Sequence, residues 1–265
     1  MKASYMLMGD PKADDGSTMY WRDTILQLKT AGLQGADLRS SYLDLINETW
    51  DDAVAFLRDN GIEPALYWVT TDFITPDVDV EASLDAVRRG ADVCTRLGID
   101  HIFSAGGQHT NSGPEAMSRY VESLQKALDI AKSAGLYLSI ENAGRMCHTW
   151  ESLKECVERV GPDMKVTLDG GNFIIAGSDA VRAAKELADR VIHLHVKNLV
   201  PAPGREPWPF QYTRPAQGVT DYRKVMEHVT AAGFDRYLAF EPEGWPNAPA
   251  LDGVAFCAQL ARDFS

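Results

Sequence analysis

Cysteine is scarce in this sequence of 265 residues. There are four cysteines, and no two of them have Cys-x-x-Cys spacing: Cys94, Cys147, Cys156 and Cys257. That spacing is unlike the disulfide framework of a secreted domain or the ligand pairs of a structural zinc site. We therefore expect reduced, mostly buried thiols, as in a cytoplasmic protein.

Long apolar runs are also missing. Charged residues interrupt every apolar segment, and the first ten residues, MKASYMLMGD, lack the apolar core of a signal peptide. The sequence therefore predicts no association with a membrane.

Basic residues are too few to favour a nucleic-acid partner. The chain has 26 Lys and Arg against 38 Asp and Glu, which gives a formal net charge of −12. Because tight binding to phosphate backbones needs a basic surface, we expect no nucleic-acid partner. The remaining composition is ordinary for a globular protein. Since no Pro/Gly/Ser-rich linker divides the chain, residues 1–265 are predicted to form one domain.

Eight apolar runs alternate with amphipathic segments along the chain. The predicted strands are Ser4–Met8, Ala36–Arg39, Glu63–Val69, Ile102–Ala105, Leu136–Glu141, Lys165–Asp169, Val191–Lys197 and Tyr237–Glu241. The predicted helices are Trp21–Ala31, Thr49–Asn60, Val80–Leu97, Pro114–Ala134, Thr149–Val160, Asp179–Leu187, Tyr222–Ala232 and Leu251–Arg262. Alternating strands and helices imply a parallel sheet, and eight such units predict an α/β fold of the (β/α)8 TIM barrel type.

Four predicted strands end in a residue that can bind a divalent metal. These residues are Glu141, Asp169, His195 and Glu241, which lie 28, 26 and 46 residues apart. Because (β/α)8 barrels carry their chemistry at the C-terminal ends of the strands, we expect the four side chains to gather there. Three carboxylates and one imidazole suit one divalent ion, with Mn²⁺ preferred and Mg²⁺, Co²⁺ or Zn²⁺ as alternatives.

Strand alternation separates these residues from their neighbours. Side chains two positions apart share a face, so Lys197 and His193 point inward with His195. His193 lies one layer deeper, and we expect it to be a hydrogen-bonded core residue. Two simpler interpretations stay open. Asp169 could be a turn residue, since two glycines follow it, and Glu241 could cap the final loop, since a proline follows it.

At these positions the chain resembles the xylose isomerase-like barrel superfamily, the sugar isomerases and epimerases related to apurinic endonucleases. The matching segments are SIEN at Glu141, LDGGN at Asp169, HLHVKN at His195, FEPE at Glu241 and QGVTDY at residues 217–222. The resemblance implies that the four strand-end residues bind one metal. It also implies that Glu141 and Glu241 act as an acid/base pair on opposite faces of a sugar.

The chain departs from the superfamily at three places. Many relatives have His at the position of Asn172 and Asp at the position of Asn198. The second strand commonly ends in Glu, where this chain has Ala36-Asp37-Leu38-Arg39. Arg39 could contact an anionic substrate or pair with an acidic neighbour. The extra histidines of the three-metal endonucleases are not evident, which weakens a nuclease interpretation.

Further residues are candidates for the mouth of the barrel. We predict that Lys197, His148 and Asn172 contact the substrate, and that Asn142 and Glu243 support the metal ligands. The other candidates at the mouth are His101, His109 and Arg145. The segment from Asn198 to Gln217 has five prolines and three aromatic residues, so we interpret it as a lid or substrate wall. A dimer contact in a homo-oligomer is the alternative.

Three functions are compatible with these residues. The preferred one is a metal-dependent isomerase or epimerase that removes a proton next to the carbonyl of a ketose or keto-polyol. The second keeps the site but loses water, as a lyase or dehydratase acting on a keto-sugar or keto-inositol. The third is a non-catalytic barrel that binds a sugar or a protein partner.

Overall fold

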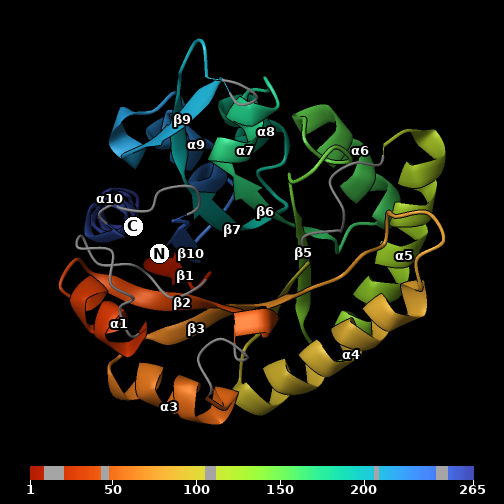
Figure 1. Cartoon of the computed structure of the whole chain (residues 1–265), viewed down its shortest axis with the longest axis horizontal. Helices are drawn as coiled ribbons and strands as arrows, with labels where there is room; N and C mark the ends of the chain where they lie inside the picture. Colours follow the sequence, from red (N-terminus) through yellow and green to blue (C-terminus); the bar gives the residue numbers. More distant parts are fainter. Residues whose placement is uncertain (9–20, 43–47, 105–111, 206–208, 243–249) are drawn as a thin grey trace.

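Eight parallel strands close into a barrel in the computed structural model (Figure 1). The structure describes residues 1–8, 21–42, 48–104, 112–205, 209–242 and 250–265. The barrel strands are β1 (Lys2–Met6), β2 (Leu33–Arg39), β3 (Glu63–Val69), β4 (His101–Ser104), β5 (Tyr137–Glu141), β6 (Lys165–Asp169), β7 (Val191–Val196) and β10 (Tyr237–Phe240). Each strand pairs with the next one in sequence, and β1 closes the barrel by pairing with β10. The predicted (β/α)8 barrel is confirmed.

Helices follow the barrel strands and pack around the outside of the sheet. They are α1 (Trp21–Lys29), α3 (Trp50–Asp59), α4 (Val80–Leu97), α5 (Pro114–Ser133), α6 (Trp150–Val160), α7 (Gly170–Ile175), α8 (Ala180–Glu186), α9 (Tyr222–Ala231) and α10 (Ala250–Asp263). Short 3-10 turns occur at Ser40–Tyr42 and Pro215–Gln217. The bounds of β3, β6 and α4 are those predicted, and the other predicted elements differ by one to three residues at an end.

Helix α4 shows how the sequence sets these boundaries. The Asp79 side chain accepts hydrogen bonds from the backbone N–H groups of Glu81 and Ala82, which caps the first turn. At the other end Gly98 has φ = 66°, a left-handed conformation that glycine adopts without strain. Between these caps, Leu84, Val87, Ala91, Cys94 and Leu97 form a buried face at helical spacing.

Part of the barrel interior is polar, whereas the layer between strands and helices is apolar. Leu168, Leu194 and Leu238 are fully buried on the outer face of their strands. Inside the barrel, the Ser139 hydroxyl lies 2.7 Å from both His101 Nε2 and Thr167 Oγ1. Buried polar groups are costly without hydrogen bonds, so this network holds the layer beneath the strand ends in one arrangement.

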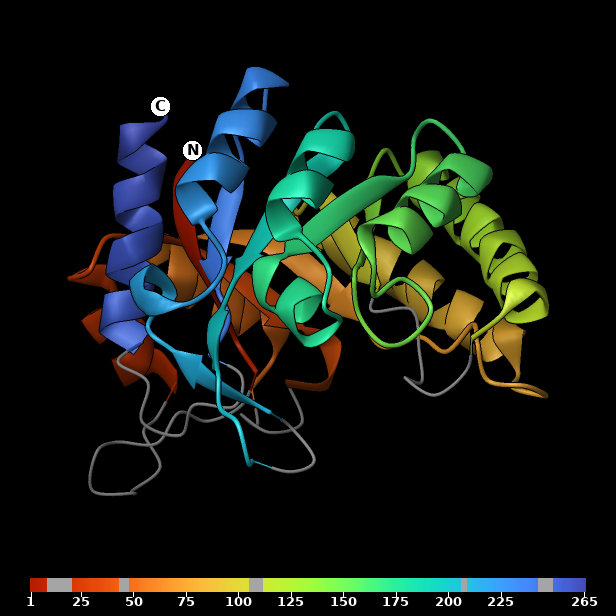
Figure 2. The same cartoon turned by 90° about the horizontal axis from the view of Figure 1, so that it is seen from above.

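The segment after β7 has more structure than a loop. Strand β8 (Asn198–Pro201) pairs antiparallel with β9 (Phe210–Thr213), and this hairpin was not predicted. Figure 2 shows the hairpin beyond the end of the barrel toward which β1 runs from the N-terminus. A role as a lid or as a dimer contact stays a prediction.

Two further expectations concern the chain as a whole. All four cysteines are free and buried, as predicted. None of the helices in the described ranges combines the length and the apolarity that a membrane span requires.

Candidate metal centre

The structure brings together the four strand-end residues that the sequence pattern selected. Glu141, Asp169 and His195 lie at or near the ends of β5, β6 and β7, and Glu241 follows β10 directly. Each residue offers one ligand atom, and these four atoms all lie within 4.8 Å of one another. Asp169 and His195 are fully buried, and the two glutamates are nearly so. The group could therefore hold one metal ion.

The contacts inside this cluster leave atoms available for a cation. His195 Nδ1 lies 2.7 Å from Glu141 Oε1 and 3.6 Å from Glu241 Oε2. Asp169 Oδ2 and Glu241 Oε2 are buried and have no hydrogen-bond partner in the part of the chain that the structure describes. Because buried oxygens without hydrogen bonds are costly, a divalent ion fits this donor set. No thiolate lies in the cluster, so the site suits hard or borderline metals.

Lys197 supplies a fixed positive charge beside the cluster. Its Nζ lies 2.9 Å from Glu241 Oε1 and 3.3 Å from Asp169 Oδ2, and the residue is 3% exposed. The Tyr222 hydroxyl accepts a hydrogen bond from Lys197 N and donates one to Lys197 O. The backbone of Lys197 is thereby held, and its ammonium partly offsets the carboxylate charge.

Burial and neighbouring charges shift the pKa values of the clustered residues in different directions. Burial raises the pKa of Asp169 well above its usual value, and the neighbouring Glu241 and Glu141 act in the same direction. Burial opposes ionisation of Glu241 as well, but Lys197 and His195 outweigh it and lower the pKa of Glu241 to about 2. For His195, burial disfavours the charged ring, yet the carboxylates of Glu141 and Asp37 raise its pKa well above 6.5.

The backbone of Asp169 is held by two neighbouring asparagines. The Asn142 side chain accepts from Asp169 N and donates to Asp169 O, both at 2.8 Å. The backbone N–H of Asn172 donates to Asp169 Oδ1 at 2.6 Å, so Asp169 is also the N-cap of α7. The turn interpretation of Asp169 and its interpretation as a ligand are therefore compatible, because its Oδ2 remains directed at the cluster.

The other residues predicted at the mouth of the barrel lie in different environments. His101 is fully buried in the barrel interior against Ser139, so its placement at the mouth was wrong. His148 is half-buried, and its Nδ1 has no hydrogen-bond partner among the described residues. Arg145 is exposed. His109 and Glu243 lie outside the described residues.

Arg39 stacks on an aromatic ring, and its expected contact with an anionic substrate stays a prediction. Its guanidinium lies 4.2 Å from the centroid of the Trp68 ring, and within the described ranges it forms no ion pair. Stacking on an aromatic face is a common use of arginine, because the ring face carries partial negative charge. The contact places Arg39 against β3.

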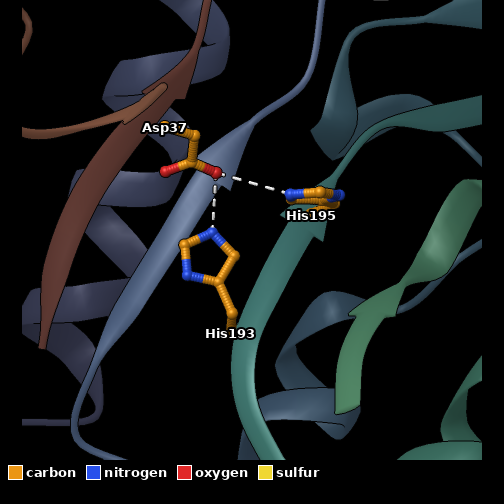
Figure 3. Close-up of side chains that lie close together, drawn as sticks. All are labelled: Asp37, His193 and His195. Atoms are coloured by element: carbon orange, nitrogen blue, oxygen red, sulfur yellow. Dashed lines mark hydrogen bonds and ion pairs between the residues drawn. The ribbon is translucent and has the colours of Figure 1, made fainter. Parts of the chain in front are cut away.

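Asp37 was not recognised as a functional candidate, although it lies close to His195. Its Oδ2 is 2.8 Å from His193 Nε2 and 3.4 Å from His195 Nε2, as Figure 3 shows. His193 is thus the buried, hydrogen-bonded residue that we expected. The missed signal was strand alternation, which places Asp37 on the same face as Arg39 and one layer deeper.

A large cavity lies elsewhere on the molecule. It has a volume of about 1410 Å³ and is lined by residues of α3, β3 and α4, including Trp50, Phe56, Tyr67 and Val93. None of the four clustered residues lines it. The chemistry described above therefore does not belong to this cavity.

The arrangement at the strand ends suits acid–base chemistry. Glu141 and Glu241 approach the same His195 nitrogen from different strands, and Lys197 is a nearby source of positive charge. Carboxylates beside a cation position can remove and return a proton on a substrate whose carbonyl that cation polarises.

Comparisons with known proteins agree with the fold. A family model described as xylose isomerase-like TIM barrel matches residues 25–260. An inosose dehydratase of Clostridium perfringens is 22% identical over 267 residues, which cover 89% of this chain and 87% of that protein. A second inosose dehydratase, from Geobacillus thermodenitrificans, is 25% identical over 158 residues, covering 54% and 52%.

Solved structures with low sequence identity share the fold. A probable 3-DHS dehydratase from Bacillus anthracis has a TM-score of 0.77 at 17% identity, with 99% of both chains covered. An L-ribulose 3-epimerase has a TM-score of 0.72 at 17% identity, covering 100% of this chain and 93% of the other. The IOLI protein with a bound zinc atom has a TM-score of 0.72 at 17% identity, covering 100% and 96%.

Proposed function

Because the chain belongs to the xylose isomerase-like TIM barrel family, we propose that it is a divalent-metal-dependent enzyme acting on a polyhydroxylated ketone. Glu141, Asp169, His195 and Glu241 would hold the metal. The observation that carries the proposal is the convergence of their ligand atoms within 4.8 Å at the strand ends. Mn²⁺ suits the donor set first, with Mg²⁺, Co²⁺ and Zn²⁺ as alternatives.

The proposed reaction begins with removal of a proton from the carbon next to the carbonyl. Glu141 and Glu241 are the proposed acid/base pair, since both reach the His195 nitrogen from different strands. The bound metal would supply a Lewis acid that stabilises negative charge on the carbonyl oxygen. Lys197, His148 and Asn172 are the proposed substrate contacts.

We place dehydration of a cyclic keto-polyol such as an inosose ahead of epimerisation. After proton removal, the carbon–oxygen bond at the next carbon breaks, and the departing hydroxide takes the abstracted proton back from the protonated glutamate and leaves as water. Lys197 would bind that hydroxyl, and the contacts of its ammonium with both Asp169 and Glu241 support this role. The inosose dehydratases matched along this chain support the same choice. It reverses the order that the sequence alone favoured.

Epimerisation is the second candidate, supported by the two carboxylates on different strands. In that reaction one glutamate removes the proton and the other returns a proton to the opposite face, so the product has the same mass. The L-ribulose 3-epimerase has the same fold, which is compatible with this outcome.

A substrate panel in D₂O tests the proposal and separates the two reactions. Wild type supplemented with Mn²⁺ or Co²⁺ is incubated with an inosose and several ketoses, and products are examined by mass spectrometry. Dehydration removes water, whereas epimerisation leaves the product with one deuterium. Glu141→Gln and Glu241→Gln should lose about 100-fold or more of the rate, the scale of a general acid–base residue.

Glu63→Gln is the matched control, because Glu63 is an exposed residue at the start of β3 and pairs only with Arg58 among the described ion pairs. It should retain wild-type activity. A wild type that binds no metal after supplementation contradicts the proposal. Sugar binding without deuterium exchange would instead support the non-catalytic barrel.

A further inference from the structure

The carboxylate of Asp37 is enclosed by side-chain donors inside the barrel. The Ser4 hydroxyl donates to Oδ1 at 2.7 Å, and His193 Nε2 lies 2.8 Å from Oδ2. His195 Nε2 lies 3.4 Å from the same Oδ2, and Asp37 is 1% exposed. Figure 3 shows this oxygen facing both imidazole rings. An ionised carboxylate only accepts hydrogen bonds, so each ring nitrogen facing it presents an N–H group.

The two nitrogens of His195 face different surroundings. Nδ1 points at the carboxylate cluster, with Glu141 Oε1 at 2.7 Å. Nε2 is buried and has no hydrogen bond at ordinary distance within the described residues, and Asp37 Oδ2 is the carboxylate oxygen that it faces. A contraction of a few tenths of an ångström would give a normal N–H···O bond.

The contact between Asp37 and His195 crosses the barrel. Asp37 lies on β2 and His195 on β7, and strands β1 and β10 separate them in the closed sheet. Because Ser4 and His193 each hold one oxygen of Asp37, the carboxylate is fixed in its orientation toward His195. His193 therefore supports Asp37, and its ring also packs edge-on against the ring of His195.

We propose that Asp37 is a positioning residue that accepts the Nε2–H of His195 and keeps the Nδ1 lone pair directed at the metal position. This inference rests on the proposed metal site. The hydrogen bond made by one ring nitrogen sets which nitrogen carries the proton, and therefore which one is free to bind a metal. Such a partner of a metal-binding histidine typically changes metal affinity by 10- to 100-fold.

The test compares zinc binding by wild type, Asp37→Asn and Ser139→Ala. Zn²⁺ is titrated against a chromophoric chelator, with circular dichroism and thermal unfolding to show that each variant is folded. Asp37→Asn keeps the side-chain shape but removes the charge, and we expect its zinc dissociation constant to rise about 10- to 100-fold. Ser139→Ala is the control, because it removes hydrogen bonds from the same buried layer without touching Asp37 or His195. Its dissociation constant should stay near that of wild type.

Nitrogen-15 NMR of zinc-loaded wild type tests the inference even where Asp37→Asn does not fold. We expect His195 to carry a proton on Nε2 and the metal on Nδ1, with one zinc ion per chain. Metal bound to Nε2 of His195 would overturn the inference. Two zinc ions per chain, with the second lost in His193→Gln, would overturn it as well. In either case Asp37, His193 and His195 would themselves be metal ligands. Unchanged affinity in folded Asp37→Asn would also overturn it. A wild type that binds no zinc overturns the proposed function together with this inference.

Discussion

The side-chain amide of Asn142 pairs with both main-chain hydrogen-bonding groups of Asp169. Its Oδ1 accepts from Asp169 N and its Nδ2 donates to Asp169 O, each at 2.8 Å. Both residues are fully buried. Since Asn142 directly follows Glu141, this pair joins the ends of β5 and β6 and fixes the backbone that carries two of the clustered residues.

Replacing Asn142 with alanine should destabilise the fold and weaken metal binding together. The substitution leaves the N–H and C=O of Asp169 buried without these partners, which we expect to cost about 2–4 kcal/mol of unfolding free energy. Urea unfolding and zinc titration measure the two effects. Asn60→Ala is the control, since Asn60 makes one partly exposed side-chain bond to Phe56 O, and it should change neither quantity strongly. A loss of stability with unchanged zinc affinity would show that the Asn142–Asp169 pair does not position the metal ligands.

Asn198 occupies a position where the superfamily often has aspartate, and its hydrogen bonds explain the amide. Its Nδ2 donates to the carbonyls of Pro215 and Thr220, and its Oδ1 accepts from the N–H groups of Thr220 and Leu199. An aspartate would place a carboxylate oxygen against two carbonyl oxygens. We therefore expect Asn198→Asp to lower the unfolding free energy by about 2–4 kcal/mol, measured by urea unfolding. Asn60→Asp should lower the unfolding free energy much less. An equal loss of unfolding free energy in both variants would argue against this explanation of Asn198.

The sequence predicted the barrel well because its periodic signals are local. Helix α4 is marked by Asp79 at one end and Gly98 at the other, and its bounds were correct. The hairpin of β8 and β9 was missed because its prolines and short strands give no alternating pattern. Helix α7 was also missed, since six residues that begin with two glycines carry little helical periodicity.

The candidate site was predictable where the residues lie at strand ends, and less so below them. Glu141 and His195 follow from position and alternation alone. The contact of Asp37 with His193 joins residues 156 positions apart across the barrel, and no local pattern records which inward residues face one another. His101 was misplaced because it is the first residue of β4, at the end of the strand opposite to the mouth.

Removing the positive charge of Lys197 should make the stability of the protein depend more on bound metal. In the metal-free protein, Lys197→Met leaves Glu241 and Asp169 without their nearby cation, and breaking a buried pair typically costs 3–5 kcal/mol. A divalent ion would replace that charge, so added zinc should raise the melting temperature more in Lys197→Met than in wild type. Thermal unfolding with and without zinc measures the difference.

Lys154→Met is the matched control for Lys197→Met. Lys154 pairs with Glu186 at 2.9 Å on the partly exposed surface, where an ion pair contributes little. Its melting temperature and its zinc-induced shift should stay close to those of wild type. Equal zinc-induced shifts in Lys197→Met and wild type would show that Lys197 does not occupy the charge position of a metal.

Metal binding should strengthen as pH rises from about pH 6 to about pH 8. Burial and neighbouring carboxylates raise the pKa of Asp169, and Glu141 and Asp37 raise the pKa of His195 against the effect of burial. Both groups therefore keep their protons to higher pH in the metal-free folded protein than they would in water, and a bound metal must displace these protons. The stability they contribute is present at low pH and is lost as pH rises through their folded pKa values, whereas zinc binding gains about 1.4 kcal/mol per pH unit for each proton displaced.

The measurement is the zinc-induced increase in melting temperature at several pH values across this range. It should grow with pH, because the metal-free protein loses stability while the zinc-loaded protein does not. Asp37 does not reverse the trend, since its pKa is lowered by His193 and His195 despite its burial, and it titrates only under acidic conditions. His195→Gln should lose most of the zinc-induced shift at every pH, because it removes a proposed metal ligand, and Glu63→Gln should leave the pH dependence unchanged. A zinc-induced shift that does not change with pH would show that Asp169 and His195 are already deprotonated before the metal binds.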